Sequence, residues 1–171
     1  MNSAWVLDVA RGLATRALSR AVADLVWAPD VRRFAYRSPA ANTIIEQPAF
    51  GGPEHIVGDY PGLLGIEDWS RDGRYLAMEV VGGGGRNRGL VAPVDGSKPI
   101  VVVEADSVDE LHFSPDGRLI AYNSNESGRH EVYLASLPPT GERWQVSTAE
   151  ASKAGGAEMG VSCTSSRQTA R

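Results

Sequence analysis

The sequence has few cysteines and histidines and no long apolar run. Its 171 residues contain one cysteine, Cys163, and three histidines, which excludes an internal disulfide framework and a multi-cysteine metal centre. The longest purely aliphatic stretch, residues 100–103, is far shorter than the ~20 apolar residues of a membrane-spanning helix. Asp8 and Arg11 interrupt the first apolar positions, so we expect no signal peptide there.

A surplus of basic charge is also missing. Lys and Arg number 17 against 21 Asp and Glu, which gives a formal net charge of -4. A protein that binds nucleic acid neutralises phosphates with surplus cationic side chains, so we expect no nucleic-acid partner. Turn-forming residues, by contrast, are plentiful, with 19 glycines and 10 prolines. This composition favours many turns over long helices.

An internal repeat accounts for many of these turns. Similar ten-residue segments stand at residues 27–36, 69–78 and 113–122. Their first residues, Trp27, Trp69 and Phe113, are 42 and 44 residues apart. A four-stranded propeller blade has a period of about 40–45 residues. Each segment predicts a hairpin in which the aromatic residue ends one strand and a second, apolar strand follows a tight turn.

The repeated residues have structural roles in this prediction. Proline presets φ, aspartate binds the backbone of the turn and glycine tolerates a positive φ. These turn residues are Asp30, Asp72, Gly73, Pro115, Asp116 and Gly117. Val31 replaces the glycine in the first copy, and because a β-branched residue disfavours a positive φ, we expect that turn to be distorted or of another type. The three aromatic residues are interpreted as blade-to-blade contacts and not as a ligand-stacking stripe, since each buries about 150–250 Å².

The other segments complete the blades. Third and fourth strands are predicted at residues 43–47 and 54–57, 90–94 and 100–103, 131–136 and 143–147, and an isolated pair at 5–9 and 14–18. The predicted fold class is all-β, a partial β-propeller of about three and a half blades of four antiparallel strands. The predicted parts are a half blade at 1–20, blades at 21–60, 61–105 and 106–148, and a disordered tail at 149–171. Closed propellers typically use four to eight blades, so we expect a fragment of a larger propeller or self-association through open blade edges.

The copy at residues 113–121, Phe-Ser-Pro-Asp-Gly-Arg-Leu-Ile-Ala, is the most complete. It resembles the WD40-like β-propeller repeats of the TolB type, and the resemblance extends over about residues 5–148. Residues 123–133 and 144–148 look more narrowly like the propeller that follows the kinase domain in some bacterial transmembrane serine/threonine kinases. Similar repeats occur in the periplasmic Tol-Pal system and in prolyl-oligopeptidase-type peptidases. The resemblance implies a periplasmic or other extracytoplasmic location, which the sequence alone does not indicate.

Motifs for catalysis are not found in the sequence. A kinase needs a Gly-rich loop, His-Arg-Asp and Asp-Phe-Gly, and a peptidase of this type needs Gly-x-Ser-x-Gly. The glycine run at residues 82–89 lacks the Gly-Lys-Ser/Thr ending of a phosphate loop and is predicted to be a loop between two strands. Asp30, Asp72 and Asp116 supply one carboxylate per blade, too few for the six to eight oxygens of a Ca²⁺ site. We therefore expect no cofactor, no metal and no catalytic residue.

Two hypotheses of function follow. In the first, the chain is a non-catalytic propeller segment of a bacterial protein that serves protein–protein interaction or ligand sensing, without inserting into a membrane. Its predicted partner-binding loops carry Arg86, Arg88, Glu126, Arg129 and His130. In the alternative, it is the regulatory propeller of a larger enzyme, a serine/threonine kinase or a prolyl-oligopeptidase-type peptidase, whose catalytic domain lies outside this sequence.

Overall fold

The computed structural model describes residues 4–19, 22–38 and 41–147 of the chain. These residues form β-strands, with one short 3₁₀ helix, η1 (Gly83–Gly85). Each strand pairs antiparallel with the next strand of its sheet. The predicted all-β class is therefore confirmed, whereas the predicted tail at 149–171 lies outside the described residues.

The strands form one two-stranded sheet and three four-stranded sheets, and within every sheet they follow chain order. The half-blade consists of β1 (Ala4–Asp8) and β2 (Leu13–Leu18). Blade 1 consists of β3 (Ala23–Trp27), β4 (Arg33–Arg37), β5 (Thr43–Pro48) and β6 (His55–Asp59). Blade 2 consists of β7 (Leu63–Trp69), β8 (Tyr75–Val81), β9 (Asn87–Pro93) and β10 (Ile100–Ala105). Blade 3 consists of β11 (Val108–Phe113), β12 (Leu119–Ser124), β13 (Glu131–Ser136) and β14 (Arg143–Gln145).

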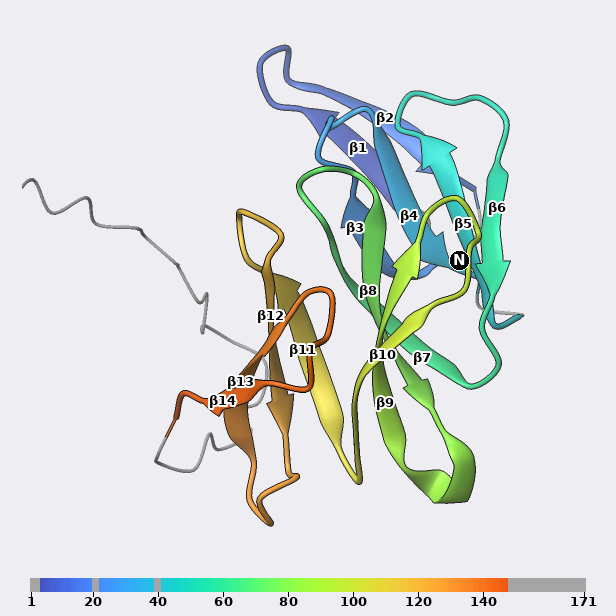
Figure 1. Ribbon diagram of the computed structural model, residues 1–171. Coiled ribbons are helices and arrows are strands. Elements are labelled where there is room, and N and C mark those ends of the chain that lie inside the picture. The colour runs from blue at the N-terminus through green and yellow to red at the C-terminus, as the bar shows by residue number, and fades with distance from the viewer. Residues whose placement is uncertain (1–3, 20–21, 39–40, 148–171) are drawn as a thin grey trace, which may run out of the picture.

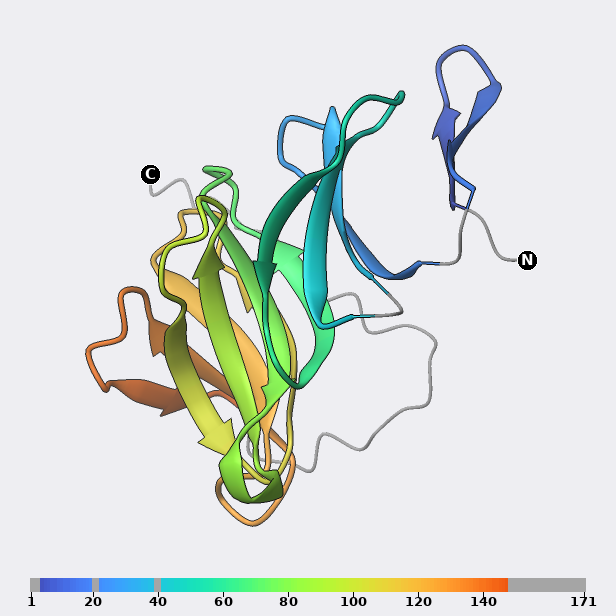
Figure 2. The same ribbon diagram turned by 90° about the vertical axis from the view of Figure 1, so that its right-hand side faces the viewer.

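The sheets stand beside one another in chain order (Figures 1 and 2). The first strand of each blade lies against the first strand of the next, β3 beside β7 and β7 beside β11. These three are the inner strands of the blades, and Figure 2 shows the half-blade on the far side of blade 1. The arrangement is an arc of propeller blades, which short turns within each blade make possible.

Apolar side chains fill the space between consecutive sheets. Because successive strand residues point to opposite faces, each sheet supplies side chains to the sheet before it and to the sheet after it. Ile44 of blade 1 and Leu76 of blade 2 are among the residues of one cluster. Val91 of blade 2 and Ile120 of blade 3 belong to the next. A smaller cluster joins the half-blade to blade 1, so burial between sheets is the main source of stability.

The turn at Val31 is not distorted, contrary to expectation. Its backbone N–H donates to Ala28 O at 2.9 Å, and the glycine N–H in the other two copies donates to Ser70 O at 2.8 Å and to Ser114 O at 2.9 Å. Val31 adopts this shared turn with φ +53°. Pairing of β3 with β4 on both sides of the turn therefore imposes the geometry, and the valine backbone is strained.

Candidate functional site

The connections between strands gather at two ends of blades 2 and 3. The repeated turns, residues 70–74 and 114–118, lie at what we call the turn end. The β8–β9 connection (82–86), the β10–β11 connection (106–107) and the β12–β13 connection (125–130) lie at the opposite end, which we call the loop end. The predicted structural residues thus stand at one end and the predicted partner-binding loops at the other.

At the turn end, the repeated aspartate closes each turn. Asp72 Oδ1 accepts the Ser70 hydroxyl at 2.7 Å and the backbone N–H of Arg74 at 3.0 Å. Asp116 accepts the equivalent serine hydroxyl at 2.7 Å and backbone N–H at 3.1 Å. Asp30 has no serine beside it and accepts a backbone N–H at 2.9 Å and an arginine Nε–H at 3.0 Å. Pro115, Gly73 and Gly117 complete these turns, with φ +77° and +70° at the two glycines.

These bonds favour the ionised form of the aspartates. The pKa of Asp30 lies below its ordinary value, chiefly because the Arg32 N–H binds the carboxylate. The Ser114 hydroxyl is the main cause of the lowered pKa of Asp116. Burial acts against ionisation of Asp72, but its hydrogen bonds outweigh burial and lower its pKa. The aspartates thus serve the turns, and no group of three or more His, Cys, Asp or Glu among the described residues could hold a metal ion.

The three repeated aromatic residues have different surroundings. Trp69 is 5% exposed in the cluster between blades 1 and 2, with the Arg33 guanidinium 5.7 Å from its ring centroid. Phe113 packs against the cluster between blades 2 and 3. Trp27 remains 43% exposed and makes an edge contact with Phe34, which differs from the expected inter-blade contact. Among the described residues, Val6 and Leu18 of the half-blade pack on β4 in the cluster with Phe34 and Tyr36, and Trp27 is not part of this cluster.

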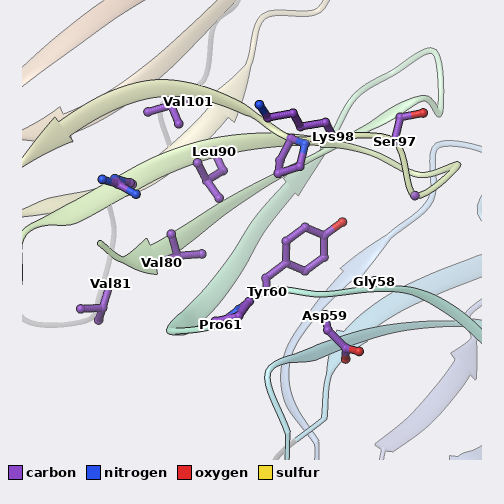
Figure 3. A pocket seen from close by; sticks show the side chains of 13 residues that line it. Gly58, Asp59, Tyr60, Pro61, Val80, Val81, Leu90, Ser97, Lys98 and Val101 are labelled. Atoms are coloured by element: carbon purple, nitrogen blue, oxygen red, sulfur yellow. The ribbon is translucent and has the colours of Figure 1, made fainter. Parts of the chain in front are cut away.

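A pocket of about 440 Å³ lies between blades 1 and 2. In Figure 3 the Tyr60 ring projects from the β6–β7 connection toward the segment that carries Ser97 and Lys98. Four valine and leucine side chains of β8, β9 and β10 line one part of it, namely Val80, Val81, Leu90 and Val101. Charged residues also line it, namely Asp59, Arg88 and Lys98. Burial raises the pKa of Tyr60, so its hydroxyl stays protonated. The pocket therefore combines apolar side chains with charged groups of both signs.

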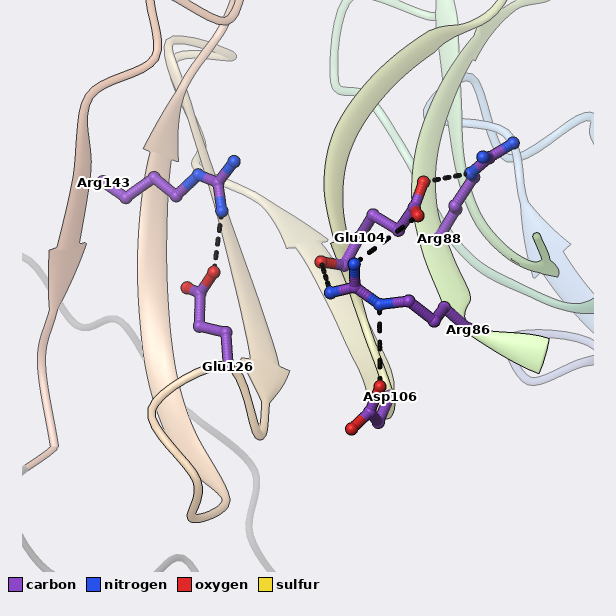
Figure 4. Close-up of polar contacts among 6 residues, drawn as sticks. All are labelled: Arg86, Arg88, Glu104, Asp106, Glu126 and Arg143. Carbon is purple, nitrogen blue, oxygen red and sulfur yellow. Dashed lines mark hydrogen bonds and ion pairs between the residues drawn. The ribbon is translucent and has the colours of Figure 1, made fainter. Parts of the chain in front are cut away.

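The loop end of blade 2 is held together by Arg86 (Figure 4). Its Nη2 donates to the backbone oxygen of Glu104 at 2.8 Å, and its Nε lies 3.6 Å from Asp106 Oδ1. Arg88 Nε donates to Glu104 Oε2 at 2.5 Å. The predicted loop 82–89 is shorter than expected, because β9 begins at Asn87. Arg88 therefore lies on a strand, and the loop itself ends at Arg86.

The loop end of blade 3 is centred on Glu126. Its Oε2 accepts Arg143 Nη1 at 2.7 Å, and its Oε1 accepts the Tyr122 hydroxyl at 3.2 Å. Burial, and then the negative charge of Glu126, raise the pKa of Tyr122. Arg143 was not predicted, because it lies on β14 whereas its partner lies in the β12–β13 loop, 17 residues earlier in the sequence. Glu126 thus ties the β12–β13 loop to the outermost strand.

Arg129 and His130 complete this end of blade 3. Arg129 Nη2 lies 3.7 Å from Oε1 of the buried Glu131, while the other carboxylate oxygen accepts the Ser147 hydroxyl. Arg129 thereby provides a counter-charge to a carboxylate that would otherwise be costly to bury. His130 is half-buried beside it. The five predicted loop residues therefore lie in two neighbouring groups, one on each blade.

Sequence analysis also missed a set of carboxylates on the inner strands. Glu67 of β7 stands near Asp24 of β3 and near Asp109 and Glu110 of β11, and their negative charges act on it. Its pKa is raised, first by burial and then by the charge of Asp24. Asp24 is itself paired with Arg37 at 2.8 Å. The signal in the sequence was an acidic residue one to four positions before each repeated aromatic.

Comparison with known proteins shows the fold. No family model and no curated protein matches the chain. Among the described residues, no helix is long and apolar enough to cross a membrane. Solved structures, however, match with high probability.

TolB from Acinetobacter baumannii matches with a TM-score of 0.72 at 18% identity, over 84% of this chain and 37% of that one. A putative TolB from Agrobacterium tumefaciens matches with 0.68 at 16% identity, over 82% and 52%. A chain of the nidogen/laminin complex matches with 0.60 at 14% identity, over 78% and 52%. This chain thus spans about a third to a half of the length of these structures. Its fold is that of TolB and other WD40-like β-propeller proteins, as the repeat motif predicted.

Proposed function

We propose that this chain is a non-catalytic β-propeller segment that binds a protein or peptide partner through its loop end. The observation that carries the proposal is the grouping of cationic and anionic side chains from blades 2 and 3 at this end. Arg86 and Arg129 have side chains that are 48% and 60% exposed. Both are available to a partner while neighbouring carboxylates hold them in place.

The exposed ion pairs at the loop end, unlike the pair of Arg129 with the buried Glu131, are better explained by recognition than by stability. Exposed ion pairs contribute only about 0–1 kcal/mol, so Arg86 with Asp106 or Arg143 with Glu126 adds little to folding. Neighbouring charges of opposite sign can match the charges of a polar partner and fix the orientation in which the partner binds. Arginine is also enriched where interfaces concentrate their binding energy. The arrangement therefore suits a partner with charges of both signs.

The β8–β9 loop adds exposed main chain to this surface. Gly84 and Gly85 have φ +72° and +79°, and a Cβ at either would meet nothing within 4 Å. The loop is closed at its base by the Gly82 N–H, which donates to Arg86 O at 2.6 Å. A short loop that is anchored before binding loses less conformational entropy when a partner docks. One of the solved structures with this fold comes from a protein–protein complex, which supports a protein partner in general.

The proposal is tested by selecting random displayed peptides on the purified chain. Amide hydrogen exchange of the chain is then measured with an enriched peptide bound. We expect slower exchange at residues 82–86 and 125–130 and unchanged exchange at the turn end, residues 70–74. Failure to enrich any peptide, or protection confined to the turn end, would count against the proposal.

We also propose an extracytoplasmic location, because the repeats resemble those of the TolB type. Fractionation of the source cells, followed by an antibody raised against this chain, measures the location. Signal in the periplasmic or external fraction is expected, and signal in the cytoplasmic fraction alone contradicts it.

A further inference from the structure

We propose that the pocket between blades 1 and 2 binds a small apolar carboxylate, with the ammonium group of Lys98 as its counter-charge. The ligand has an aromatic or aliphatic body that fits a cavity of about 440 Å³, and it carries a single carboxylate group. Residues of both blades, from β6 to β10, line the pocket, and the loop-end connections do not contribute to it. This inference is therefore independent of the partner proposed for the loop end.

Lys98 is a cation without a partner in the described part of the chain. It forms no ion pair or hydrogen bond there, and it lies in the exposed turn between β9 and β10. In Figure 3 its side chain extends toward the side of the pocket on which Val101 lies. The other cation in the lining, Arg88, already donates to Glu104 Oε2 at 2.5 Å. Lys98 is therefore the cation of the pocket that is free to bind an anion.

Tyr60 provides a second hydrogen-bond donor for the carboxylate. Its hydroxyl forms no hydrogen bond with another described residue, and because burial raises its pKa it stays protonated and can donate to a carboxylate oxygen. The absence of a side chain at Gly58 makes room for this group, since a Cβ there would lie 3.0 Å from the hydroxyl oxygen. The Tyr60 ring projects toward the segment that carries Lys98 (Figure 3). The two donors therefore line one cavity from different connections.

The apolar part of the lining matches the body of the ligand. Val80 and Leu90 are 5% and 7% exposed and belong to the cluster between blades 1 and 2. Val101, in contrast, is 50% exposed, so an apolar group that covers it is removed from water together with it. Ligand sites of this kind combine an apolar lining with a few polar groups that orient the ligand.

The charges of the pocket favour one carboxylate over a phosphate. Asp59 also lines the pocket, but its Oδ1 accepts the Thr43 hydroxyl at 2.5 Å, and in Figure 3 its carboxylate points away from Tyr60 and Lys98. Because Glu104 compensates Arg88, one positive charge remains for the ligand. A phosphate group carries about 1.5–2 negative charges at pH 7 and would leave part of its charge unpaired.

The walls of the pocket are held in place by contacts within the protein. The Val81 N–H donates to Gly62 O at 2.8 Å, which fixes the β6–β7 connection to β8. On the other side, a Cβ at Gly96 would lie 3.4 Å from Val57 O, so the β9–β10 turn rests on β6. A site that is formed before the ligand arrives loses less conformational entropy on binding.

Apolar acids and their amides test the proposal with the purified chain. The probes are phenylbutyrate, naphthoate and octanoate, each compared with its own amide, which keeps the apolar body and removes the charge. Isothermal titration should show saturable binding of at least one acid at one per chain. Its amide should bind about tenfold or more weakly, because a bond to a charged group is lost. Inorganic phosphate, which has charge but no apolar body, should not compete with the acid.

Substitutions at exposed positions then locate the site. Lys98→Ala should weaken binding of the acid by about tenfold or more and leave binding of the amide unchanged, whereas Lys98→Arg keeps the charge and should retain most of the affinity. Val101→Glu should weaken binding of the acid by a similar factor, and Arg74→Ala at the turn end is the control without effect. Equal binding of acid and amide, no saturable binding of any acid, or wild-type affinity in Lys98→Ala would overturn the proposal.

Discussion

Asp68 Oδ2 accepts the backbone N–H of Phe113 at 2.8 Å, so a side chain of β7 binds the main chain of β11 in the next blade. The other oxygen, Oδ1, accepts the N–H of Trp69 at 2.8 Å. The same repeat position in blade 1 is Val26, whose side chain has no hydrogen-bond acceptor. This carboxylate therefore fastens one of the two complete blade junctions by a polar contact that the other junction lacks.

Replacing Asp68 should weaken that junction. Asp68→Ala removes a charged acceptor from two partly buried N–H groups, so we expect a loss of about 1–3 kcal/mol of unfolding free energy. Asp68→Asn retains one amide oxygen and should lose less. Urea denaturation measures both, with Arg71→Ala at an exposed turn position as the control. A change below about 0.5 kcal/mol in Asp68→Ala, the range of ordinary surface substitutions, would show that the bond does not fasten the blades.

Val31→Gly should stabilise the protein. The substitution relieves a β-branched residue at φ +53°, and the valine side chain is 72% exposed, so little burial is lost. Strain of about 1–3 kcal/mol exceeds the roughly 0.5–1 kcal/mol by which glycine favours the unfolded chain. We expect a gain of about 1 kcal/mol in denaturant unfolding. Gly117→Val, the reverse change in the third copy, should destabilise, and a gain there would refute the strain argument.

Acid should weaken the turn end. The folded-state pKa values of Asp30, Asp72 and Asp116 lie below 3.8. The contribution of these carboxylates to the free energy of unfolding is therefore complete above about pH 4 and is lost as the pH falls through the folded-state pKa values. Unfolding free energy should therefore decline between about pH 4 and pH 2. Asp116→Asn should show a shallower decline, since one of the three groups no longer titrates. Parallel curves for wild type and variant would contradict the assignment.

Glu67 should have the opposite pH dependence. Its pKa is raised above 4.5 by burial and by Asp24, so the folded chain binds this proton more tightly than the unfolded chain. Acidification through the folded pKa therefore adds stability, and the ionised group opposes folding at neutral pH. We expect Glu67→Gln to be more stable than wild type at pH 7, with the difference closing toward pH 4.5. A difference that is independent of pH would contradict this.

Local sequence signals predicted the turns and most strand positions well. The Ser-Pro-Asp-Gly turn forms its own hydrogen bonds within a few residues. The turn that contains Asp116 can therefore be predicted from its own residues, without the rest of the chain. The prediction that the turn at Val31 is distorted was wrong, because the pairing of β3 with β4 imposes the same turn on a residue that disfavours it. Arg88 was placed in a loop, because the hydrogen bond that closes the loop at Gly82 is not visible in the composition of a glycine run.

Contacts between blades were beyond what the sequence could predict. Phe113 lies 45 residues after Asp68, and nothing local marks Asp68 as its acceptor. The exposure of Trp27 depends on which strands stand beside blade 1, although its repeat position was identified. The repeat thus predicts the four-stranded blade. Packing between blades decides which of its residues contact the next blade and which stay exposed.

The central claim, that the loop end binds a protein partner, is tested most directly by isothermal titration of one selected peptide against three proteins. These are the wild type, Arg86→Ala at the loop end and Arg74→Ala at the turn end. Both arginines are exposed and paired with carboxylates, so the variants are matched in chemistry. The account predicts that Arg86→Ala weakens binding by about tenfold or more, as loss of an interface arginine does, while Arg74→Ala has no effect. Equal affinities for all three proteins, or a loss confined to Arg74→Ala, would contradict it.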